Sequence, residues 1–213
     1  MITTRRYYID RFLYKNYYAM NGQILDIGGT KVNPRGNFRL PITLKKNLNV
    51  LNINSNTNPD YLLSIEKKLN INKKFDTIIM NEVIEYIDNL DNVFFNISNL
   101  SKSNSVVFIS WPWMNTFHGD KELDLKRYSK LYISRKLKNI GFDNISIKNN
   151  GGIFSVIWDF VHRLNNENSN IITRKITNIF LLVTFRIVIK LDQIFDTSEY
   201  ITTGFTLIAK NCK

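Results

Sequence analysis

The stretch Ile24-Leu25-Asp26-Ile27-Gly28-Gly29 decides the fold. Residues 23–27 have the pattern of a short apolar strand that contains one acid and stops at two adjacent glycines. The chain has only nine glycines, so a pair directly after a strand indicates a turn that needs the conformational freedom or small volume of glycine. An ordinary tight turn is the simpler alternative for the pair alone. A dinucleotide-binding fingerprint is excluded because Pro34 follows where that motif opens a helix.

Strands and helices alternate outward from this stretch. We predict further strands over residues 48–53, 75–80, 105–109, 143–148 and 200–209, and helices over residues 5–20, 59–69, 88–100 and 129–139. Residues 30–46 have the prolines and glycine of a loop. Alternation at this spacing favours an α/β fold with a mostly parallel sheet and helices on both faces. In such sheets, ligands bind outside the carboxyl ends of the strands.

Residues 153–199 form an insertion before the last strand, with predicted helices over 153–164 and 171–195. The second helix has an apolar face at helical spacing, made by Ile176, Phe180, Val183, Ile187 and Leu191. We expect this face to cover the sheet or an acceptor site. The alternative is a dimer helix or a peripheral membrane contact through residues 171–195, because Arg174, Lys175, Arg186 and Lys190 are suited to anionic lipid.

The length of 213 residues favours one domain with an elaboration. We expect residues 1–213 to form a single domain, with an N-terminal helix in 1–22, a ligand-binding core in 23–150, the insertion in 153–199 and the last strand in 200–210.

The net charge of +11 is concentrated in residues 1–50 and 101–150. Part of the lysine excess fits an AT-rich genome, because asparagine, lysine and isoleucine are all frequent. For the rest we expect a basic rim, from the N-terminal segment and residues 121–138, that suits an anionic or phosphorylated small molecule. We do not expect a nucleic-acid partner.

The single cysteine, Cys212, excludes a disulfide within the chain and a cysteine-based zinc site. The two histidines are far apart and the carboxylates have no recognised ligand spacing, so we expect no metal site. The N-terminus has no apolar signal region. The longest uncharged apolar stretch near the C-terminal end, residues 176–185, falls well short of the roughly 18 residues that span a bilayer. We expect a cytoplasmic protein.

The opening stretch resembles the first motif of class I S-adenosylmethionine-dependent methyltransferases, and FDTIIMNEVIEYI at residues 75–87 resembles their fourth-strand region. A third set narrows the resemblance to the small-molecule branch with a type 11 methyltransferase domain, whose members often act in cell-surface polysaccharide pathways. This set is Ser110-Trp111-Pro112, His118-Gly119-Asp120, Asp124, Arg127-Tyr128 and Gly141-Phe142. The matches cover about residues 20–150.

The resemblance implies a Rossmann-like fold with a mostly parallel seven-stranded sheet, a helical insertion before the last strand, and S-adenosylmethionine as cofactor. The implied reaction is methyl transfer to an oxygen or nitrogen of a small molecule, with a sugar or sugar nucleotide of a surface-polysaccharide pathway as the candidate acceptor. The implied cofactor-binding residues are Asp26, Gly28, Gly29, Thr30, Asn52, Asn81 and Glu82. A glycine turn admits the methionine part of the cofactor, and a carboxylate can meet its ammonium group.

The sequence departs from the family pattern at several of these positions. Thr30 and Val32 stand where the family has glycines, and Asn52 or Asn54 stands where an acid usually binds the ribose. The acid that often meets the adenine is also missing, with Ser64 near its position and Asp60 four residues earlier. Glu82 and Glu85 have the alternative of a solvated helix start. Asp26 has a weaker structural alternative, because an unpaired acid in an apolar strand is costly to bury.

The acceptor site is expected in the loop after the predicted strand of residues 105–109, outside its carboxyl end. His118 titrates near neutral pH and is the candidate catalytic base, with Asp120 or Asp124 to orient it. Asp124, Arg127 and Tyr128 are the candidate substrate-binding residues. A local salt-bridge cluster that holds the loop is the alternative, and His162, inside an apolar helix, is expected to be structural.

Two other functions remain open at this point. The altered glycine loop and the missing ribose acid favour a catalytically degenerate methyltransferase fold that serves as a binding or scaffold subunit. A nucleic-acid methyltransferase is the third possibility, because Ser110-Trp111-Pro112-Trp113 lies where such enzymes have an NPPY-type motif, which is itself absent.

Overall fold

The computed structural model describes residues 2–117 and 122–212. The helices are α1 (Thr4–Asn16), α2 (Ile42–Lys45), α3 (Leu90–Leu100), α4 (Lys130–Asn139), α5 (Ile153–Glu167) and α6 (Ile171–Phe195). The strands are β1 (Ile24–Ile27), β2 (Leu48–Asn52), β3 (Tyr61–Leu62), β4 (Phe75–Asn81), β5 (Ser101–Pro112), β6 (Phe142–Asn149) and β7 (Gly204–Asn211). The predicted order of elements is confirmed except at residues 59–69.

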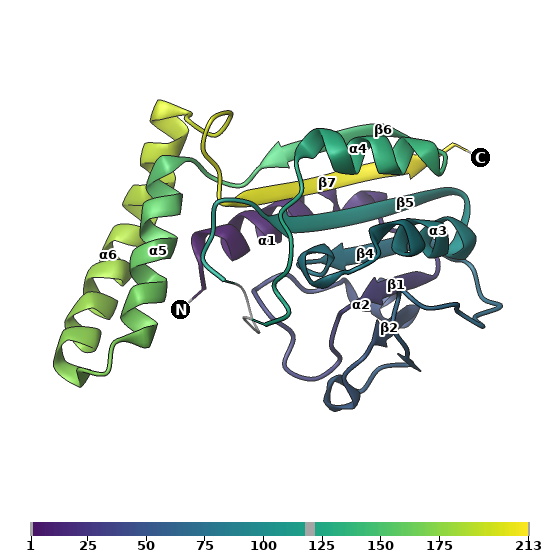
Figure 1. Cartoon of the computed structure of the whole chain (residues 1–213), viewed down its shortest axis with the longest axis horizontal. Coiled ribbons are helices and arrows are strands. Elements are labelled where there is room, and N and C mark those ends of the chain that lie inside the picture. Colours follow the sequence, from purple (N-terminus) through teal and green to yellow (C-terminus); the bar gives the residue numbers. More distant parts are fainter. Residues whose placement is uncertain (1, 118–121, 213) are drawn as a thin grey trace.

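The seven strands form one sheet in the order β3-β2-β1-β4-β5-β7-β6, and only β7 runs antiparallel to its neighbours. The mostly parallel sheet is therefore confirmed. Ile27 is level with Leu51 of β2 and with Met80 of β4, so these strands end together. Figure 1 shows this carboxyl edge turned toward the hairpin of α5 and α6.

Helices cover both faces of the sheet, as the alternating pattern predicts. On one face, α3 and α4 pack against a core that includes Leu25 and Ile78. On the other face, α1 packs against a core that includes Ile24 and Ile79. Successive side chains of a strand point to opposite faces, so these adjacent pairs bury one side chain in each core. Figure 1 shows α3 and α4 in front of the sheet and α1 behind it.

The predicted helix over residues 59–69 is wrong. Its first part is the short strand β3, in which Tyr61 pairs with Leu51 of β2. Asp60 fixes this pairing, because its backbone N–H donates to the Val50 carbonyl at 2.9 Å and its carboxylate accepts from the Val50 N–H at 2.8 Å. Asn58 is in the left-handed region with φ 51° and turns the chain into the strand. These contacts with β2 outweigh the local helical preference.

Two buried carboxylates hold α1, α5 and α6 together. Asp192 of α6 accepts two backbone N–H groups at the start of α5, each at 3.1 Å. Asp159 of α5 accepts the N–H groups of Thr4 and Arg5 at 2.8 and 3.3 Å. The first N–H groups of a helix have no partner within it and carry a partial positive charge, so a carboxylate stabilises them. The result is that Arg5 lies at the carboxyl edge of the sheet.

The expected packing of the apolar face of α6 is wrong. Ile176, Phe180, Val183 and Ile187 are 63, 59, 65 and 51% exposed. The buried residues of α6 are instead Leu181, Ile189 and Asp192. Because α5 alone packs along the length of α6, the contact buries one narrow strip of it and leaves the apolar face outward. No helix in the described ranges is long and apolar enough to cross a membrane.

Candidate functional site

The two glycines after β1 are required for different reasons. Gly28 has φ +75°, and its N–H donates to the Leu51 carbonyl at 2.8 Å, which ties the turn to β2. A Cβ on Gly28 would lie 2.4 Å from Cγ2 of Val83. A Cβ on Gly29 would lie 2.1 Å from Oδ2 of Asp26. The turn is thus closed directly over the Asp26 carboxyl group, and a larger residue at either position would displace it.

Asp26 is a half-buried acid without a hydrogen bond from any residue in the described ranges. Burial raises the pKa of Asp26 to about 7, and the Arg6 guanidinium offsets only part of this effect. Removal from water disfavours the ionised form. A bound cation beside the carboxyl group would supply the partner that the chain does not provide, which is consistent with the ammonium contact expected from the sequence.

The residues that depart from the family pattern hold the glycine turn in place. Asn52 Nδ2 donates to the Gly29 carbonyl at 2.7 Å, and Asn52 Oδ1 accepts from the Asn54 N–H at 3.0 Å. Thr30 Oγ1 donates to the Val32 carbonyl at 2.5 Å and accepts from the Val32 N–H at 3.1 Å. An aspartate at position 52 has no donor for the Gly29 carbonyl. The donor of the Asn52 amide therefore explains why an asparagine stands here, because an ionised acid could not make this hydrogen bond.

The residues near the expected adenine position are also engaged within the chain. The Asp60 carboxylate pairs with the Lys31 ammonium at 2.5 Å. Burial opposes ionisation of Asp60, but the Lys31 ammonium and the Val50 N–H together hold its pKa below the usual value. Ser64 Oγ accepts from the Glu66 N–H at 3.3 Å. The ion pair joins the loop after β1 to the residue before β3, so these two segments lie together at the carboxyl edge of the sheet.

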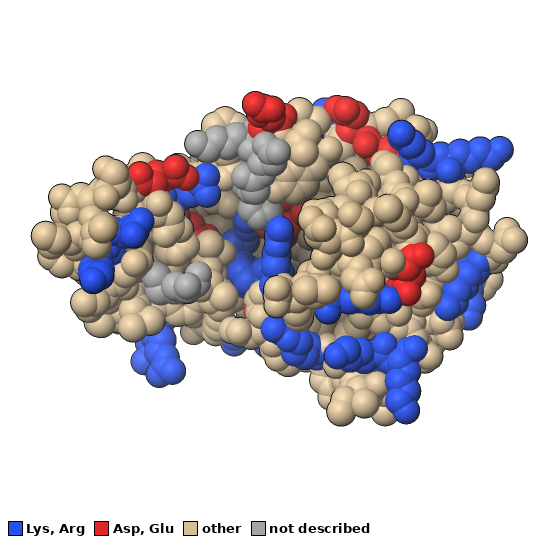
Figure 2. All heavy atoms as spheres, turned by 90° about the horizontal axis from the view of Figure 1, so that it is seen from below, with Lys and Arg blue, Asp and Glu red and all other residues tan. Residues whose placement is uncertain are grey.

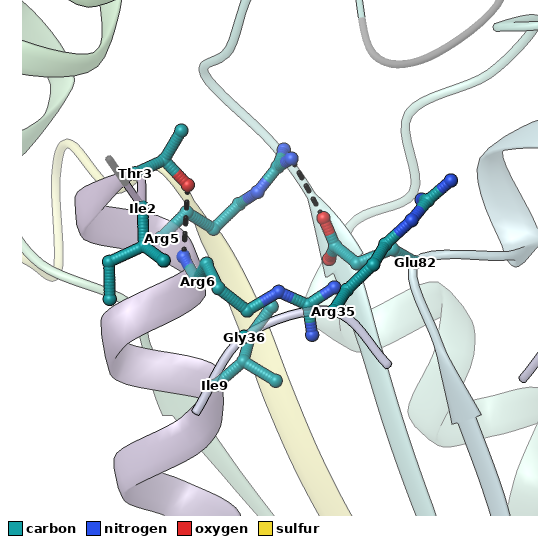
Figure 3. A pocket seen from close by; sticks show the side chains of 8 residues that line it. All are labelled: Ile2, Thr3, Arg5, Arg6, Ile9, Arg35, Gly36 and Glu82. Carbon is teal, nitrogen blue, oxygen red and sulfur yellow. Dashed lines mark hydrogen bonds and ion pairs between the residues drawn. The ribbon is translucent and has the colours of Figure 1, made fainter. Parts of the chain in front are cut away.

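A pocket of about 230 Å³ lies between the first turns of α1, residues 35–36 of the loop after β1, and Glu82. Arg5 and Arg6 come from the first turn of α1, Arg35 from the loop after β1, and Glu82 from the end of β4 (Figure 3). Figure 2 shows blue side chains around a hollow between the α5–α6 hairpin and the sheet. Three guanidinium groups and one carboxylate leave the lining with an excess of positive charge.

Arg5 and Glu82 form the buried part of this pocket. Arg5 Nη2 lies 2.8 Å from Glu82 Oε2, and the two side chains are 5 and 3% exposed. Arg5 Nη1 is buried and has no hydrogen-bond partner in the described part of the chain. Glu82 has φ 57°, and Ser110 Oγ donates to its Oε1 at 3.3 Å. The alternative of a solvated helix start is wrong, because Glu82 and Glu85 are both buried.

Two electrostatic effects locate the other arginines. The positive charge of Arg6 lowers the pKa of Asp26 against the effect of burial. Burial raises the pKa of Tyr86, with Glu85 adding to the rise, and the Arg35 guanidinium opposes it. Neither arginine has an ion pair with a residue in the ranges that the structure describes. Arg6 is therefore close enough to Asp26, and Arg35 to Tyr86, to affect their ionisation, and both guanidinium groups are available to a ligand in the pocket.

The expected acceptor residues are placed only in part. His118 and Asp120 lie outside the described residues. Asp124 is buried, and its carboxylate accepts hydrogen bonds from both Nη atoms of Arg127. Nη2 lies 2.8 Å from Oδ2. The backbone N–H groups of residues 125 and 126 donate to the Glu85 carbonyl at 3.0 and 3.2 Å. Residues 125–126 are thus attached to the segment that follows β4. The guanidinium of Arg127 is paired with Asp124, as the salt-bridge alternative predicts.

The last predicted site residues have structural contacts of their own. The carbonyl of Tyr128 accepts from Trp111 Nε1 at 2.8 Å, and its ring stacks on Tyr132. Burial raises the pKa of Tyr128 to about 12. Asn81 is the last residue of β4, next to Glu82, and is half-buried. Asn81 is thus at the edge of the site, while Tyr128 holds the loop.

Sequence reasoning missed the individual pocket arginines. It located the charge of residues 1–50 but not that Arg5 and Arg35, thirty positions apart, face one pocket. The second expected part of the basic rim differs from the prediction, because Lys130 and Lys136 pair with Glu199 and Asp91. The signal in the sequence is the Arg5-Arg6 pair at the start of the helix that precedes β1 along the chain.

Comparisons with known proteins place the fold. No protein-family model matches the sequence, and no curated protein is significantly similar to it. Among solved structures, a methyltransferase dependent on S-adenosylmethionine from Archaeoglobus fulgidus matches with a TM-score of 0.56 and 15% identity, over 97% of this chain and 94% of that one. The cyclase SpnF matches with a TM-score of 0.60 and 11% identity, over 97% and 81%.

A third similar structure is a phosphoethanolamine N-methyltransferase of Haemonchus contortus, in complex with phosphomonomethylethanolamine and S-adenosylhomocysteine. It has a TM-score of 0.57 and 15% identity, and the match covers 95% of this chain but 52% of that protein. The chain therefore has the fold of class I S-adenosylmethionine-dependent methyltransferases. At these identities the likeness concerns the fold, and SpnF, whose name describes a cyclase, shows why activity needs its own argument.

Proposed function

We propose that the protein transfers a methyl group from S-adenosylmethionine to an oxygen or nitrogen of a small molecule. The observation that carries this proposal is the turn of Gly28 and Gly29 closed over Asp26, at the carboxyl edge of a methyltransferase-type sheet. In open α/β sheets this edge is where ligands bind. A raised pKa at such an edge is itself an indication of a functional site.

The residues fit the methionine end of the cofactor better than its ribose. The carboxyl group of Asp26 has no described partner and suits an ammonium group, and Gly28 and Gly29 keep side chains away from it. At the ribose end the usual acid is replaced by Asn52, which has an acceptor but no negative charge. When bound, the cofactor supplies an electrophilic methyl group on a sulfonium. Thr30, Asn81 and Glu82 complete the proposed surroundings.

The pocket of Arg5, Arg6 and Arg35 supports an acceptor with an anionic group. A phosphate or carboxylate can take guanidinium N–H groups in pairs, and such charge-assisted hydrogen bonds are strong and directional. Arg5 already shares its charge with Glu82, so its unpartnered Nη1 and the side chains of Arg6 and Arg35 are the available donors. We propose a phosphorylated sugar or sugar nucleotide of a surface-polysaccharide pathway as the acceptor, and a cytoplasmic location.

Catalysis in this proposal is mainly positioning. Alignment of an acceptor atom with the methyl carbon contributes up to about 7–11 kcal/mol for ideal geometry. The buried pair of Arg5 and Glu82 fixes the floor of the pocket, so an anionic group held there presents the rest of the acceptor toward the glycine turn. The proposed base is His118, oriented by Asp120, and a base contributes about 10²–10⁴-fold.

Two measurements test the proposal. Calorimetric titration with S-adenosylmethionine and S-adenosylhomocysteine should show binding that Asp26→Asn weakens, while Asp143→Asn, an exposed acid on β6, leaves it unchanged. Transfer of a labelled methyl group is then measured against a panel of sugar nucleotides. Folded protein that binds neither cofactor form would refute the proposal.

The alternative is a degenerate fold that serves as a binding or scaffold subunit. The neutral Asn52 and its hydrogen bond to Gly29 favour it, because they replace the ribose acid. This alternative predicts that S-adenosylhomocysteine binding is absent or that no acceptor is methylated until a partner chain is added. The same methyl-transfer assay, run with and without candidate partner chains, separates the two functions.

A further inference from the structure

The outward face of α6 carries an apolar stripe in which Lys190 is the basic member. Its members recur at helical spacing and are 71, 63, 65, 51 and 72% exposed: Ile172, Ile176, Ile179, Ile187 and Ile194. The helix has 25 residues, so the stripe runs along an element of about 37 Å. Single exposed apolar residues are ordinary, whereas a contiguous apolar surface of this kind marks a contact with a partner or a membrane.

Exposed basic side chains lie near the beginning of α6 and again in its second half. Arg174, Lys175, Arg186 and Lys190 are all exposed. None of them has an ion pair with a residue in the described ranges. The one acid of α6, Asp192, is buried and accepts N–H groups of α5. The exposed surface of this helix is therefore apolar and cationic, without a compensating acid.

This charge distribution distinguishes between two occupants. A second copy packed through the same face would place basic residues against basic residues, with no acid on either helix to pair with them. An anionic bilayer surface matches both features, because the isoleucines enter the acyl boundary and the ammonium and guanidinium groups remain among the headgroups. Figure 2 shows the lobe of the hairpin largely tan, with separate blue side chains and some red beside the blue.

The apolar surface of α6 also borders the arginine pocket. A hollow of about 390 Å³ is lined by Ile2 together with Leu182, Val183 and Phe185 of α6. Ile2 lines the arginine pocket as well. A surface bound by α6 would thus lie next to the pocket that we assign to an anionic group.

We propose that α6 lies along an anionic lipid surface, with its isoleucine stripe at the acyl boundary and its basic side chains at the headgroups. This inference does not depend on methyl transfer, and it concerns a surface that the proposed reaction does not use. The stripe does not pack in the core of the protein, and contact with lipid explains why it faces outward.

The test is sedimentation of the full chain with vesicles of phosphatidylcholine, with and without phosphatidylglycerol. One variant replaces Ile176, Ile179 and Ile187 by serine, and another replaces Lys175, Arg186 and Lys190 by glutamine. The matched control replaces three exposed apolar residues elsewhere by serine, namely Ile42, Ile53 and Phe95, which are 79, 72 and 63% exposed. Because all of these side chains are exposed, the variants should retain the circular dichroism of the parent.

We expect the parent and the control to sediment with the phosphatidylglycerol vesicles and the serine variant of α6 to remain in solution. The glutamine variant should bind about 100-fold more weakly, since each basic residue near an anionic surface contributes about fivefold, and salt should weaken the parent. Three results would overturn the proposal: no sedimentation of the parent, equal loss in the control, or a dimer that the serine variant of α6 abolishes while vesicles are not bound.

Discussion

Asp26→Asn should make the protein more stable at neutral pH while weakening cofactor binding. The pKa of the Asp26 carboxyl is about 7 in the folded chain against 3.8 for the unperturbed group. The folded state therefore binds more protons than the unfolded state between about pH 4 and pH 7, so stability falls as the pH rises through this range. Three pKa units at about 1.4 kcal/mol each set a ceiling of about 4 kcal/mol. Solvent screening of this half-buried group reduces the expected effect to about 2 kcal/mol.

The assay is urea unfolding of parent and variant from about pH 3 to about pH 8.5, a range that brackets the window of about pH 4 to 7. Asparagine has no charge to bury, so the variant should match the parent at the acid end and exceed it by about 2 kcal/mol at the alkaline end. Burial also raises the pKa of Asp159, to about 6, but this group is present in both proteins and cancels in the difference. A difference that does not change with pH, or a variant that is less stable at the alkaline end, would refute the reasoning.

Three further substitutions test the site. Gly29→Ala puts a Cβ 2.1 Å from Asp26 Oδ2 and should cost about 1–3 kcal/mol in urea unfolding and abolish S-adenosylhomocysteine binding in calorimetry; unchanged binding would contradict this geometry. Asn52→Asp removes the donor to the Gly29 carbonyl and should lower the thermal midpoint and the affinity for S-adenosylhomocysteine, whereas tighter binding would mean that the family's ribose acid had been restored. Arg35→Gln should weaken binding of UDP-glucose, as a probe, about 10- to 100-fold and leave S-adenosylhomocysteine affinity unchanged; loss of the latter instead would assign the pocket to the carboxylate of the cofactor.

Six of the seven strands could be predicted from the sequence because their apolar runs are short and separated by turn residues. The strand of residues 75–81 and the glycine pair after residue 27 depend on local signals of this kind. Residues 59–69 could not be predicted, because the strand there depends on the two hydrogen bonds between Asp60 and Val50. A propensity argument has no access to a partner ten positions away.

The sequence points to the proposed centre of the site and not to its rim. Asp26 stands out as an acid within an apolar strand, so it could be chosen as a candidate site residue because an unpaired acid is costly to bury. Arg35 lies in an irregular loop, and only the folded chain brings it beside Arg5 and Glu82. The direction of the α6 stripe had two interpretations in the sequence, since an apolar helical face predicts a contact but not its partner.

Proton release on cofactor binding tests the central claim most directly. S-adenosylhomocysteine is titrated into the protein at pH 6 in buffers of different ionisation enthalpy. If the ammonium group of the ligand pairs with Asp26, binding should lower the pKa of this carboxyl and release close to one proton, about 0.9, per protein molecule. The release should vanish in Asp26→Asn and fall toward zero for the parent above about pH 8. Binding without proton release, or no binding by folded protein, would contradict the account.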